Sequence, residues 1–433
     1  MDPHITEWLN LAIRWVHMIV GIAWIGASFY FVWLENNLNR VNPKTGLSGD
    51  LWAIHGGGIY HLEKYKLAPP EMPEHLHWFK WEAYFTWITG VLLLAVVYYL
   101  NAEIYLIAPG SGLSPTTAIA IGVGALVAGW FIYDLLCDSP LGKTPMLLGA
   151  VLFVLLVGAA YGLAQVFSGR GAYIHVGAII GTIMVGNVFR VIMPAQRNLV
   201  SAIEENREPD PALPAKGLLR SRHNNYLTLP VLFIMISNHF PSTYGSEYNW
   251  AILAGLAIFS ILVRHYFNTR HGSQKFAWTV PVAALGMVTL AFVTSPYAKK
   301  AAAPVAKAPA AVEATAQPEA SSTDTVAATS DSLEQTGASA SESAVPSGVS
   351  FAAINKVIQE RCSVCHSATP THAAFAAAPA GVILDTPQEI QANGPRIAQT
   401  VNTKYMPLGN LTQMTDDERV LVGNWVEQGS VIN

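Results

Sequence analysis

The sequence predicts an all-α protein in which eight transmembrane helices are followed by a flexible linker and a small helical domain. Charged residues make up 12% of the chain and hydrophobic residues 52%, whereas soluble globular proteins average about 25% and 45–50%. Eight apolar segments have roughly the 20-residue length that a bilayer requires. A stretch rich in Ala, Pro, Ser and Thr then separates these segments from residues 349–433.

The eight predicted spans lie between residues 9 and 294. They run from Leu9 to Leu34, Trp81 to Leu100, Thr116 to Leu136, Pro145 to Phe167, His175 to Met193, Leu227 to Phe240, Trp250 to Val263 and Phe276 to Thr294. The sixth and seventh are short by hydropathy and can extend into their flanks. Because the first residues lack the positive charge of a signal peptide, we expect the first span to remain in the mature protein.

The distribution of Lys and Arg predicts the orientation of the bundle. The first, third, fifth and seventh connections together carry fourteen of these residues, whereas the N-terminus and the other connections offer only Arg170. The positive-inside rule therefore predicts that the N-terminus and residues 349–433 lie outside the lipid bilayer.

The composition also divides the chain into three parts. Residues 298–348 contain almost no large apolar residue, and such a segment cannot bury enough surface to fold, so we predict a disordered linker. We therefore expect a transmembrane catalytic domain over residues 1–297, a linker over 298–348 and a separate domain over 349–433. The net charge is −4 and no basic tract occurs, so nothing favours nucleic acid as a partner.

Residues 361–366 contain the sharpest chemical signal. Cys362-Ser363-Val364-Cys365-His366 is the C-x-x-C-H pattern for covalent haem attachment, with the two thiols adding to one porphyrin and His366 as the proximal ligand. A zinc pair, a disulfide and a thioredoxin-like redox pair are the alternatives. Zinc needs a second pair of ligands, for which only His372 lies near, and the redox pair would need a strand–helix context.

A methionine downstream is the expected second axial ligand. We assign Met406, within Tyr405-Met406-Pro407, and Met414 is the alternative. A Met-Pro loop before a final amphipathic helix, predicted from Asp416 to Gln428, is similar to class I cytochromes c. Methionine opposite histidine raises the reduction potential, which suits an electron acceptor. Because haem c is attached outside the bacterial cytoplasmic membrane, the motif agrees with a periplasmic location of this domain at the inner membrane.

Histidines in the predicted spans are candidates for a second redox centre. His17 lies within the first span, His175 opens the fifth and His239 closes the sixth. Ionisable groups at membrane depth are costly and are functional candidates by default. They are plausible ligands of an intramembrane haem b or another metal, while hydrogen bonding at the membrane interface is the alternative.

The whole chain resembles the bacterial membrane-bound urate hydroxylases, which are urate oxidases with a C-terminal cytochrome c domain. Besides the haem motif, the resemblance rests on residues 15–26 (WVHMIVGIAWIG), 55–58 (HGGG), 78–84 (WFKWEAY), 175–187 (HVGAIIGTIMVGN), 223–230 (HNNYLTLP) and 236–239 (ISNH). It implies oxidation of urate to 5-hydroxyisourate with water as the oxygen source. Electrons would leave through haem c to a soluble cytochrome c or a terminal oxidase.

Such a reaction sets requirements for the substrate site. Urate is a flat anion with amide-like edges, so the site needs a cation, paired donors and acceptors, and an aromatic face. The candidates are Arg222 or Arg190 for the charge, Asn224, Asn225 and Asn187 for the edges, and His223 or His55 as general base. A quinol-oxidising protein with a fused cytochrome c, and a permease with a regulatory haem tail, are the competing interpretations.

Overall fold

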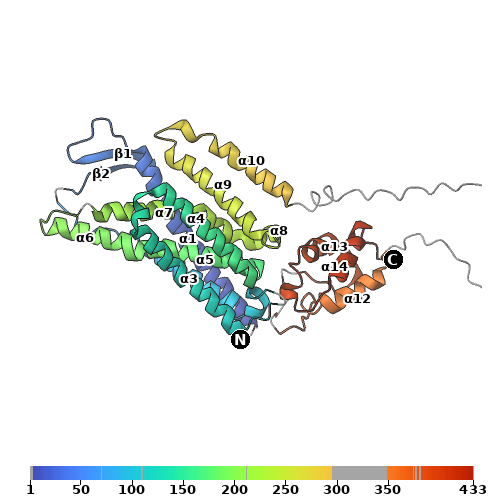
Figure 1. Cartoon of the computed structure of the whole chain (residues 1–433). Coiled ribbons are helices and arrows are strands. Elements are labelled where there is room, and N and C mark those ends of the chain that lie inside the picture. Colours follow the sequence, from blue (N-terminus) through green and yellow to red (C-terminus); the bar gives the residue numbers. More distant parts are fainter. Residues whose placement is uncertain are drawn as a thin grey trace, which may run out of the picture.

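The computed structural model describes residues 3–69, 71–108, 111–210, 212–294, 349–373, 375, 378–379 and 382–432. The predicted linker, residues 298–348, lies outside the described residues. Figure 1 shows a bundle of long helices, from which a two-stranded hairpin projects, and a smaller group of helices formed by the C-terminal residues.

The N-terminal bundle follows the predicted order of helices. Its elements are α1 (Pro3–Asn37), α2 (Trp81–Leu93), η1 (Leu94–Tyr99), η2 (Ala102–Leu106), α3 (Pro115–Asp138), η3 (Pro140–Lys143), α4 (Pro145–Val166), α5 (Gly169–Gly186), η4 (Asn187–Ile192), α6 (Met193–Glu204), α7 (Ala212–Ile236), η5 (Ser237–His239), α8 (Pro241–Tyr244), α9 (Asn249–Thr269), η6 (Gln274–Phe276) and α10 (Thr279–Val293). Elements α5, η4 and α6 form one continuous helical run, Gly169–Glu204.

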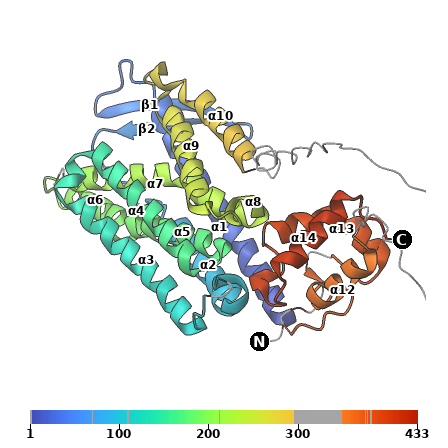
Figure 2. The same cartoon turned by 45° about the vertical axis from the view of Figure 1, so that its right-hand side comes forward.

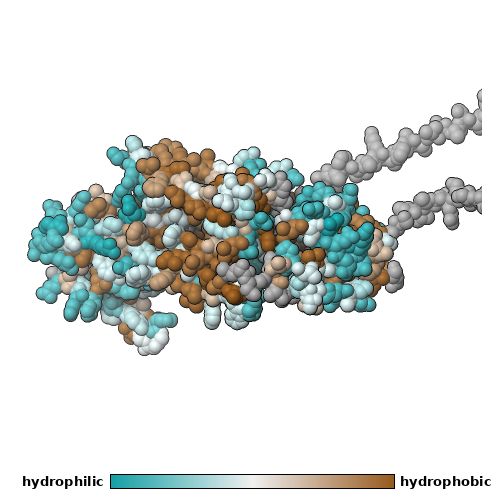
Figure 3. Space-filling model, turned by 90° about the horizontal axis from the view of Figure 1, so that it is seen from below, coloured by the Kyte–Doolittle hydropathy of each residue, from teal (hydrophilic) through white to brown (hydrophobic). Residues whose placement is uncertain are grey.

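Seven helical runs among the described residues are long and apolar enough to cross a membrane. The predicted sixth span, Leu227–Phe240, is not among them. Its residues begin within α7, whose N-terminal half carries Arg220, Arg222 and three further polar residues in succession. Nevertheless α7 is an interior helix, because it packs against α5, η4 and α9. Figure 3 shows hydrophobic surface over the middle of the molecule, between a hydrophilic end of the bundle and the hydrophilic C-terminal unit, as expected for a membrane belt.

Helix α5 is the central element of the bundle, and small residues let its neighbours approach closely. A Cβ at Gly177 would lie 2.5 Å from the side chain of Ile234 in α7. At Gly186 a Cβ would lie 2.3 Å from the ring of Trp130 in α3. Small residues at such contacts allow close van der Waals packing, on which helix association in lipid depends.

The glycine run 56–58 belongs to a β-hairpin. Strand β1 (Leu47–His55) pairs antiparallel with β2 (Gly58–Tyr65), and His55 is the partner of Gly58. Gly56 and Gly57 connect the strands with φ values of 58° and 81°. A two-residue hairpin turn of this type requires positive φ at both positions, which favours glycine. The turn thus accounts for the glycines, and neither Gly56 nor Gly57 has a neighbour within 4 Å of an added Cβ.

The C-terminal residues form a compact helical unit of α12 (Phe351–Arg361), α13 (Pro387–Asn402), η8 (Leu408–Asn410) and α14 (Asp416–Glu427). The predicted final helix is confirmed to within one residue. Thr415 caps α14 and forms a capping box with Glu418, an arrangement that satisfies the first backbone N–H groups of a helix. Trp425, which is 1% exposed, lies in the apolar core of this unit.

The C-terminal unit packs against one end of the bundle. Figures 1 and 2 both place α14 near α8 and the N-terminal end of α1. The ring of Tyr405 meets that of Tyr244 with 5.9 Å between centroids. A Cβ at Gly409, whose φ is 57°, would lie 3.0 Å from the carbonyl oxygen of Glu103 in η2. The unit therefore contacts connections that the charge distribution assigns to the outside.

Candidate functional site

Helix α7 brings neighbouring residues of the predicted urate site to two different clusters. His223 and Asn224 face α3 and η4, whereas Asn225 and Tyr226 face α9. Successive residues on an α-helix lie about 100° apart around its axis, which separates the two pairs. The predicted site is therefore divided between two buried polar clusters.

The first, the Arg220 cluster, consists of Tyr133, Asn187, Arg220, His223 and Asn224. The hydroxyl of Tyr133 lies 2.8 Å from Nδ1 of His223 and accepts a 2.8 Å hydrogen bond from Nδ2 of Asn187. Nδ2 of Asn187 also donates to Oδ1 of Asn224 at 2.9 Å. Thus three sequence-derived candidates, Asn187, His223 and Asn224, form one hydrogen-bonded group.

Two carboxylates balance the charge of Arg220. Its Nη2 lies 2.7 Å from Asp134 and 2.8 Å from Asp138, and its guanidinium stacks 5.0 Å from the Tyr133 ring centre. The Arg220 side chain is fully buried, while the two aspartates are partly exposed. Nε and Nη1 of Arg220 and Oδ1 of Asn187 find no hydrogen-bond partner among the described residues.

The second, the Arg264 cluster, consists of Phe29, Asn225, Arg264 and Asn268. Oδ1 of Asn225 accepts hydrogen bonds from Nε of Arg264 at 2.8 Å and from Nδ2 of Asn268 at 2.7 Å. The guanidinium lies 4.2 Å from the centre of the Phe29 ring. Although Arg264 is only 7% exposed, it forms no ion pair with any described residue.

A tyrosine–histidine pair flanks the Arg264 cluster. The hydroxyl of Tyr226 lies 2.8 Å from Nδ1 of His265, and the His265 ring meets Phe276 edge-on with 4.3 Å between centroids. His265 is three residues before Asn268 on α9, and residues at this spacing are neighbours on a helix surface. The cluster therefore has a titratable group beside it.

The other predicted contacts of urate lie on the surface. Arg222, Arg190 and His55 are all exposed, the first two on helices and the last at the hairpin turn. Sequence analysis missed Arg220 and Arg264, which are the buried arginines of the two clusters. Helical spacing was the available signal for Arg220, because it precedes His223 and Asn224 by three and four residues and so shares their face of α7.

The three intramembrane histidines lie in different surroundings. Nδ1 of His17 contacts the hydroxyl of Thr89 at 2.9 Å. His175 is fully buried, and its Nδ1 and Nε2 contact Gly171 O at 2.8 Å and the Tyr99 hydroxyl at 3.2 Å. His239 is exposed in η5. Among the described residues, no three or more His, Cys, Asp or Glu side chains are grouped to hold a metal ion.

An aromatic group containing Arg170 lies where the bundle meets the C-terminal unit. Nε of Arg170 donates to the Tyr98 hydroxyl and to Oδ1 of Asn238, each at 3.1 Å. Its guanidinium lies 4.8 Å from the Tyr105 ring centre. Burial raises the pKa of Tyr105, although the charge of Arg170 opposes part of this rise.

The haem motif occupies the turn after α12. The backbone N–H groups of Cys365 and His366 both donate to the carbonyl of Cys362, at 3.1 and 2.9 Å. Nδ1 of His366 lies 3.0 Å from the carbonyl oxygen of Val382. That partner fixes the tautomer that donates from Nδ1 and leaves Nε2 to bind a metal, as is usual for ligand histidines. Both thiols are free, and burial raises the pKa of Cys362 to about 12.

The two methionine candidates differ in their burial. Met414 is 3% exposed within the apolar core, whereas Met406 is partly buried and packs against the same core, as Cys362 does. Arg419 fixes the loop of Met406 by donating from Nη1 to the carbonyls of Met406 and Val401, at 2.6 and 2.8 Å. These residues fit a haem c, and Met406 remains our proposed second ligand.

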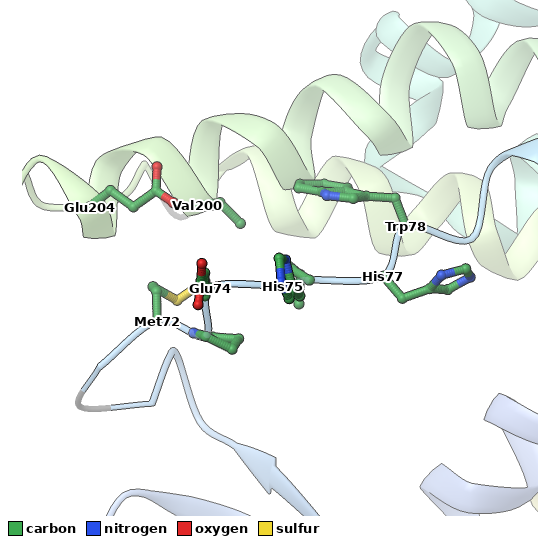
Figure 4. Close-up of a pocket in the computed structure, with 9 residues that line it drawn as sticks. Met72, Glu74, His75, His77, Trp78, Val200 and Glu204 are labelled. Carbon is green, nitrogen blue, oxygen red and sulfur yellow. The ribbon is translucent and has the colours of Figure 1, made fainter.

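An open pocket of 510 Å³ lies between the segment preceding α2 and helix α6. It is lined by Met72, Pro73, Glu74, His75, Leu76, His77, Trp78, Val200 and Glu204. In Figure 4 the ring of His77 points away from Val200 and Glu204. The pocket contains no residue of either buried cluster, so it is separate from the candidate site.

Comparison with known proteins identifies the bundle. The model of the family described as "Urate oxidase N-terminal" matches residues 3–295, which is more than half of the chain and includes both clusters. No curated protein and no solved structure matches the chain. The haem motif lies beyond the matched residues. The chain belongs to the urate oxidase N-terminal family.

Proposed function

We propose that the protein is a membrane-bound urate hydroxylase that oxidises urate to 5-hydroxyisourate and passes the electrons to a haem c in residues 349–433. One observation carries the proposal: a bundle of the urate oxidase N-terminal family is joined to a C-x-x-C-H motif, and the unit with that motif packs against the bundle. An oxidase region and an electron acceptor in one chain raise the local concentration of the acceptor.

The reaction balances without dioxygen. Urate and water give 5-hydroxyisourate, two electrons and two protons. A haem held by Cys362, Cys365 and His366 would supply an acceptor that takes one electron at a time. A histidine is a suitable proton acceptor, because the unperturbed pKa of an imidazole is about 6.5. His223 in the Arg220 cluster and His265 beside the Arg264 cluster are the two partly buried candidates.

Electrons have to travel from α7 to the other end of the bundle. Arg264 is fifteen residues from Asn249, the first residue of α9, which at 1.5 Å per residue is about 22 Å. The Arg170 group, with Tyr98 and Tyr105, lies at the end of the bundle against which the C-terminal unit packs. An intramembrane haem b or metal held by His17, His175 or His239 would shorten the distance and remains a prediction.

Membrane helices, the haem motif and the positive-inside rule together support a location in the bacterial inner membrane, with the N-terminus and the haem unit on the periplasmic side. A soluble cytochrome c or a terminal oxidase would then accept the electrons from the haem unit.

A visible spectrum of anaerobic full-length protein before and after urate addition tests the proposal. We expect the bands of reduced haem c to appear with urate alone, and pyridine haemochrome analysis to identify the haem type. If dithionite reduces the haem but urate does not, the proposal is wrong. Reduction by a quinol analogue in that same protein would favour the quinol-oxidising alternative.

A further inference from the structure

The charge of Arg264 has no counter-ion among the residues that the structure describes. Its side chain is 7% exposed, and none of its partners, Asn225 through Nε and Phe29 through the ring face, carries a negative charge. Burying a charged group is costly unless it is paired and hydrogen-bonded. The cluster therefore carries one uncompensated positive charge within a membrane-spanning bundle.

Two polar atoms of the same cluster are also unsatisfied. Nη2 of Arg264 and Oδ1 of Asn268 are buried and have no hydrogen-bond partner among the described residues. Nearly all buried polar side-chain atoms in proteins are hydrogen-bonded, so such atoms call for a partner. Here the partner has to accept from a guanidinium and donate to an amide oxygen.

Those requirements define the chemistry of a ligand. A planar heterocyclic anion offers a charged oxygen or nitrogen for Nη2 of Arg264 and a ring N–H for Oδ1 of Asn268. Hydrogen bonds that involve an ionised group are about twice as strong as neutral ones. The urate monoanion has this combination of charge, planarity and alternating donors and acceptors.

The Arg264 cluster also lies near one end of the bundle. Arg264 is five residues before the end of α9 and Phe29 eight residues before the end of α1. At 1.5 Å per residue these depths are about 8 and 12 Å. Both helix ends lie on the side that the charge distribution assigns to the inside, so an anion would cross only a small part of the bundle.

We propose that the Arg264 cluster binds the anionic edge of the urate substrate, with Arg264 as the counter-ion and Asn268 as the acceptor for a ring N–H. This inference rests on the proposed urate oxidation and adds the residues that bind the substrate charge. The Arg220 cluster does not provide this charge, because Asp134 and Asp138 already balance its arginine.

Equilibrium binding of radiolabelled urate to the full-length protein tests the proposal. Reducing the haem with dithionite beforehand, under anaerobic conditions, prevents turnover during the measurement. We expect Arg264→Gln to raise the Kd about 10- to 100-fold, the effect of losing a hydrogen bond to a charged group. Arg264→Lys should bind more tightly than Arg264→Gln because it keeps the charge.

Arg270→Gln is the matched control. It removes one positive charge from the C-terminal end of the same helix, where Arg270 stacks on Phe267 outside the cluster. We expect this variant to bind urate like the wild type. Asn268→Ala gives a second test should Arg264→Gln fail to fold, and we expect it to raise the Kd about 3- to 10-fold.

The outcomes separate this inference from the proposed function. Wild-type affinity in folded Arg264→Gln, or in both Arg264→Lys and Asn268→Ala if Arg264→Gln does not fold, would overturn the Arg264 site. If urate reduces the haem of the wild-type protein nonetheless, the proposed function stands and only the site is wrong. Failure of urate to bind the wild-type protein or reduce its haem would overturn both.

Discussion

Arg220 and Arg264 are both buried arginines at the same end of the bundle. Arg220 lies on α7, and Arg264 lies on α9 and contacts α7 through Asn225. Arg220 pairs with two carboxylates at 2.7 and 2.8 Å. Arg264 has only amide and aromatic partners. In the first cluster Asp134 and Asp138 are balanced by Arg220 and by Lys216, which lies 2.8 Å from Asp138. That cluster therefore offers no free positive charge to an anionic substrate, whereas the second is positive and would attract it.

This difference shows that an amide-rich and histidine-rich motif does not by itself locate the site of an anion. His223-Asn224-Asn225-Tyr226 supplies side chains of the right chemistry to both clusters. The charge balance around each arginine distinguishes them. Arg220 is thus the candidate for a structural role and Arg264 the candidate for substrate binding.

The largest difference between the two clusters is expected in urate turnover, when the histidine beside each arginine is replaced. His265→Gln should lower urate turnover by about 10²- to 10⁴-fold, the usual contribution of a general base. His223→Gln should lower it much less, because the Arg220 cluster does not bind the anion. Steady-state urate oxidation, normalised to haem c content, measures both. The reverse order of effects would move the reaction to the Arg220 cluster.

Thermal unfolding should show the opposite order: the free energy of unfolding should fall on replacing Arg220 and not on replacing Arg264. Arg220→Gln leaves Asp134 without its cation and Asp138 with Lys216 alone, and breaking a buried ion pair costs about 3–5 kcal/mol. We expect about 3 kcal/mol, because the aspartates are partly exposed. Arg264→Gln should leave the stability unchanged or raised, since it removes a buried unpaired charge. Equal losses of stability in the two variants would contradict the distinction.

The contact between bundle and haem unit offers a way to separate substrate binding from electron transfer. Gly409→Ala would place a Cβ 3.0 Å from Glu103 O and 3.2 Å from Ile104 O. A cost of about 1.4 kcal/mol corresponds to tenfold weaker docking. We expect slower urate-driven haem reduction in stopped-flow measurements, with urate affinity unchanged. An unchanged reduction rate would mean that this contact is not the route of electron transfer.

The smallest effect is expected at an ion pair far from both clusters. Burial alone would raise the pKa of Glu418, but hydrogen bonds from Arg361 and the Thr415 N–H outweigh it and hold this pKa below its usual value. A lowered carboxyl pKa stabilises the fold above the pKa of the unfolded state, and this stabilisation is lost as the pH falls through the folded value. Glu418→Gln should therefore lower the melting temperature of the haem unit at pH 7, but not at an acidic pH where the carboxyl of the folded wild type is protonated. Haem circular dichroism measures both melting temperatures. An equal loss at both pH values would exclude the ionised carboxylate as the cause.

Much of the fold was predictable because hydropathy dominates the energetics of a membrane chain. Seven predicted spans coincide with apolar helical runs. The predicted final helix at Asp416 agrees to one residue with α14, where a capping box defines the start. The sixth span was the exception. Helix α7 is buried by its neighbours and carries polar side chains into the bundle, so hydropathy reports only its apolar C-terminal half.

The candidate site was predictable only in part, because sequence shows which residues are polar but not which are buried together. Asn187, His223 and Asn224 were predicted to act together, and the structure joins them by hydrogen bonds, but in the cluster whose arginine is already paired. Arg222 was preferred to Arg220, although Arg220 has the helical spacing to face His223. Arg264 pairs with Asn225 across 39 positions of sequence, a tertiary contact that no local pattern indicates.

Counting electrons tests the central claim most directly. Limiting urate is added to an excess of oxidised, anaerobic full-length protein, and the reduced haem c is measured from its visible bands. Our account predicts two haems c reduced for each urate consumed, with 5-hydroxyisourate carrying an oxygen atom from ¹⁸O-labelled water. Haem that dithionite reduces but urate leaves oxidised, or product formation only when dioxygen is admitted, would contradict it.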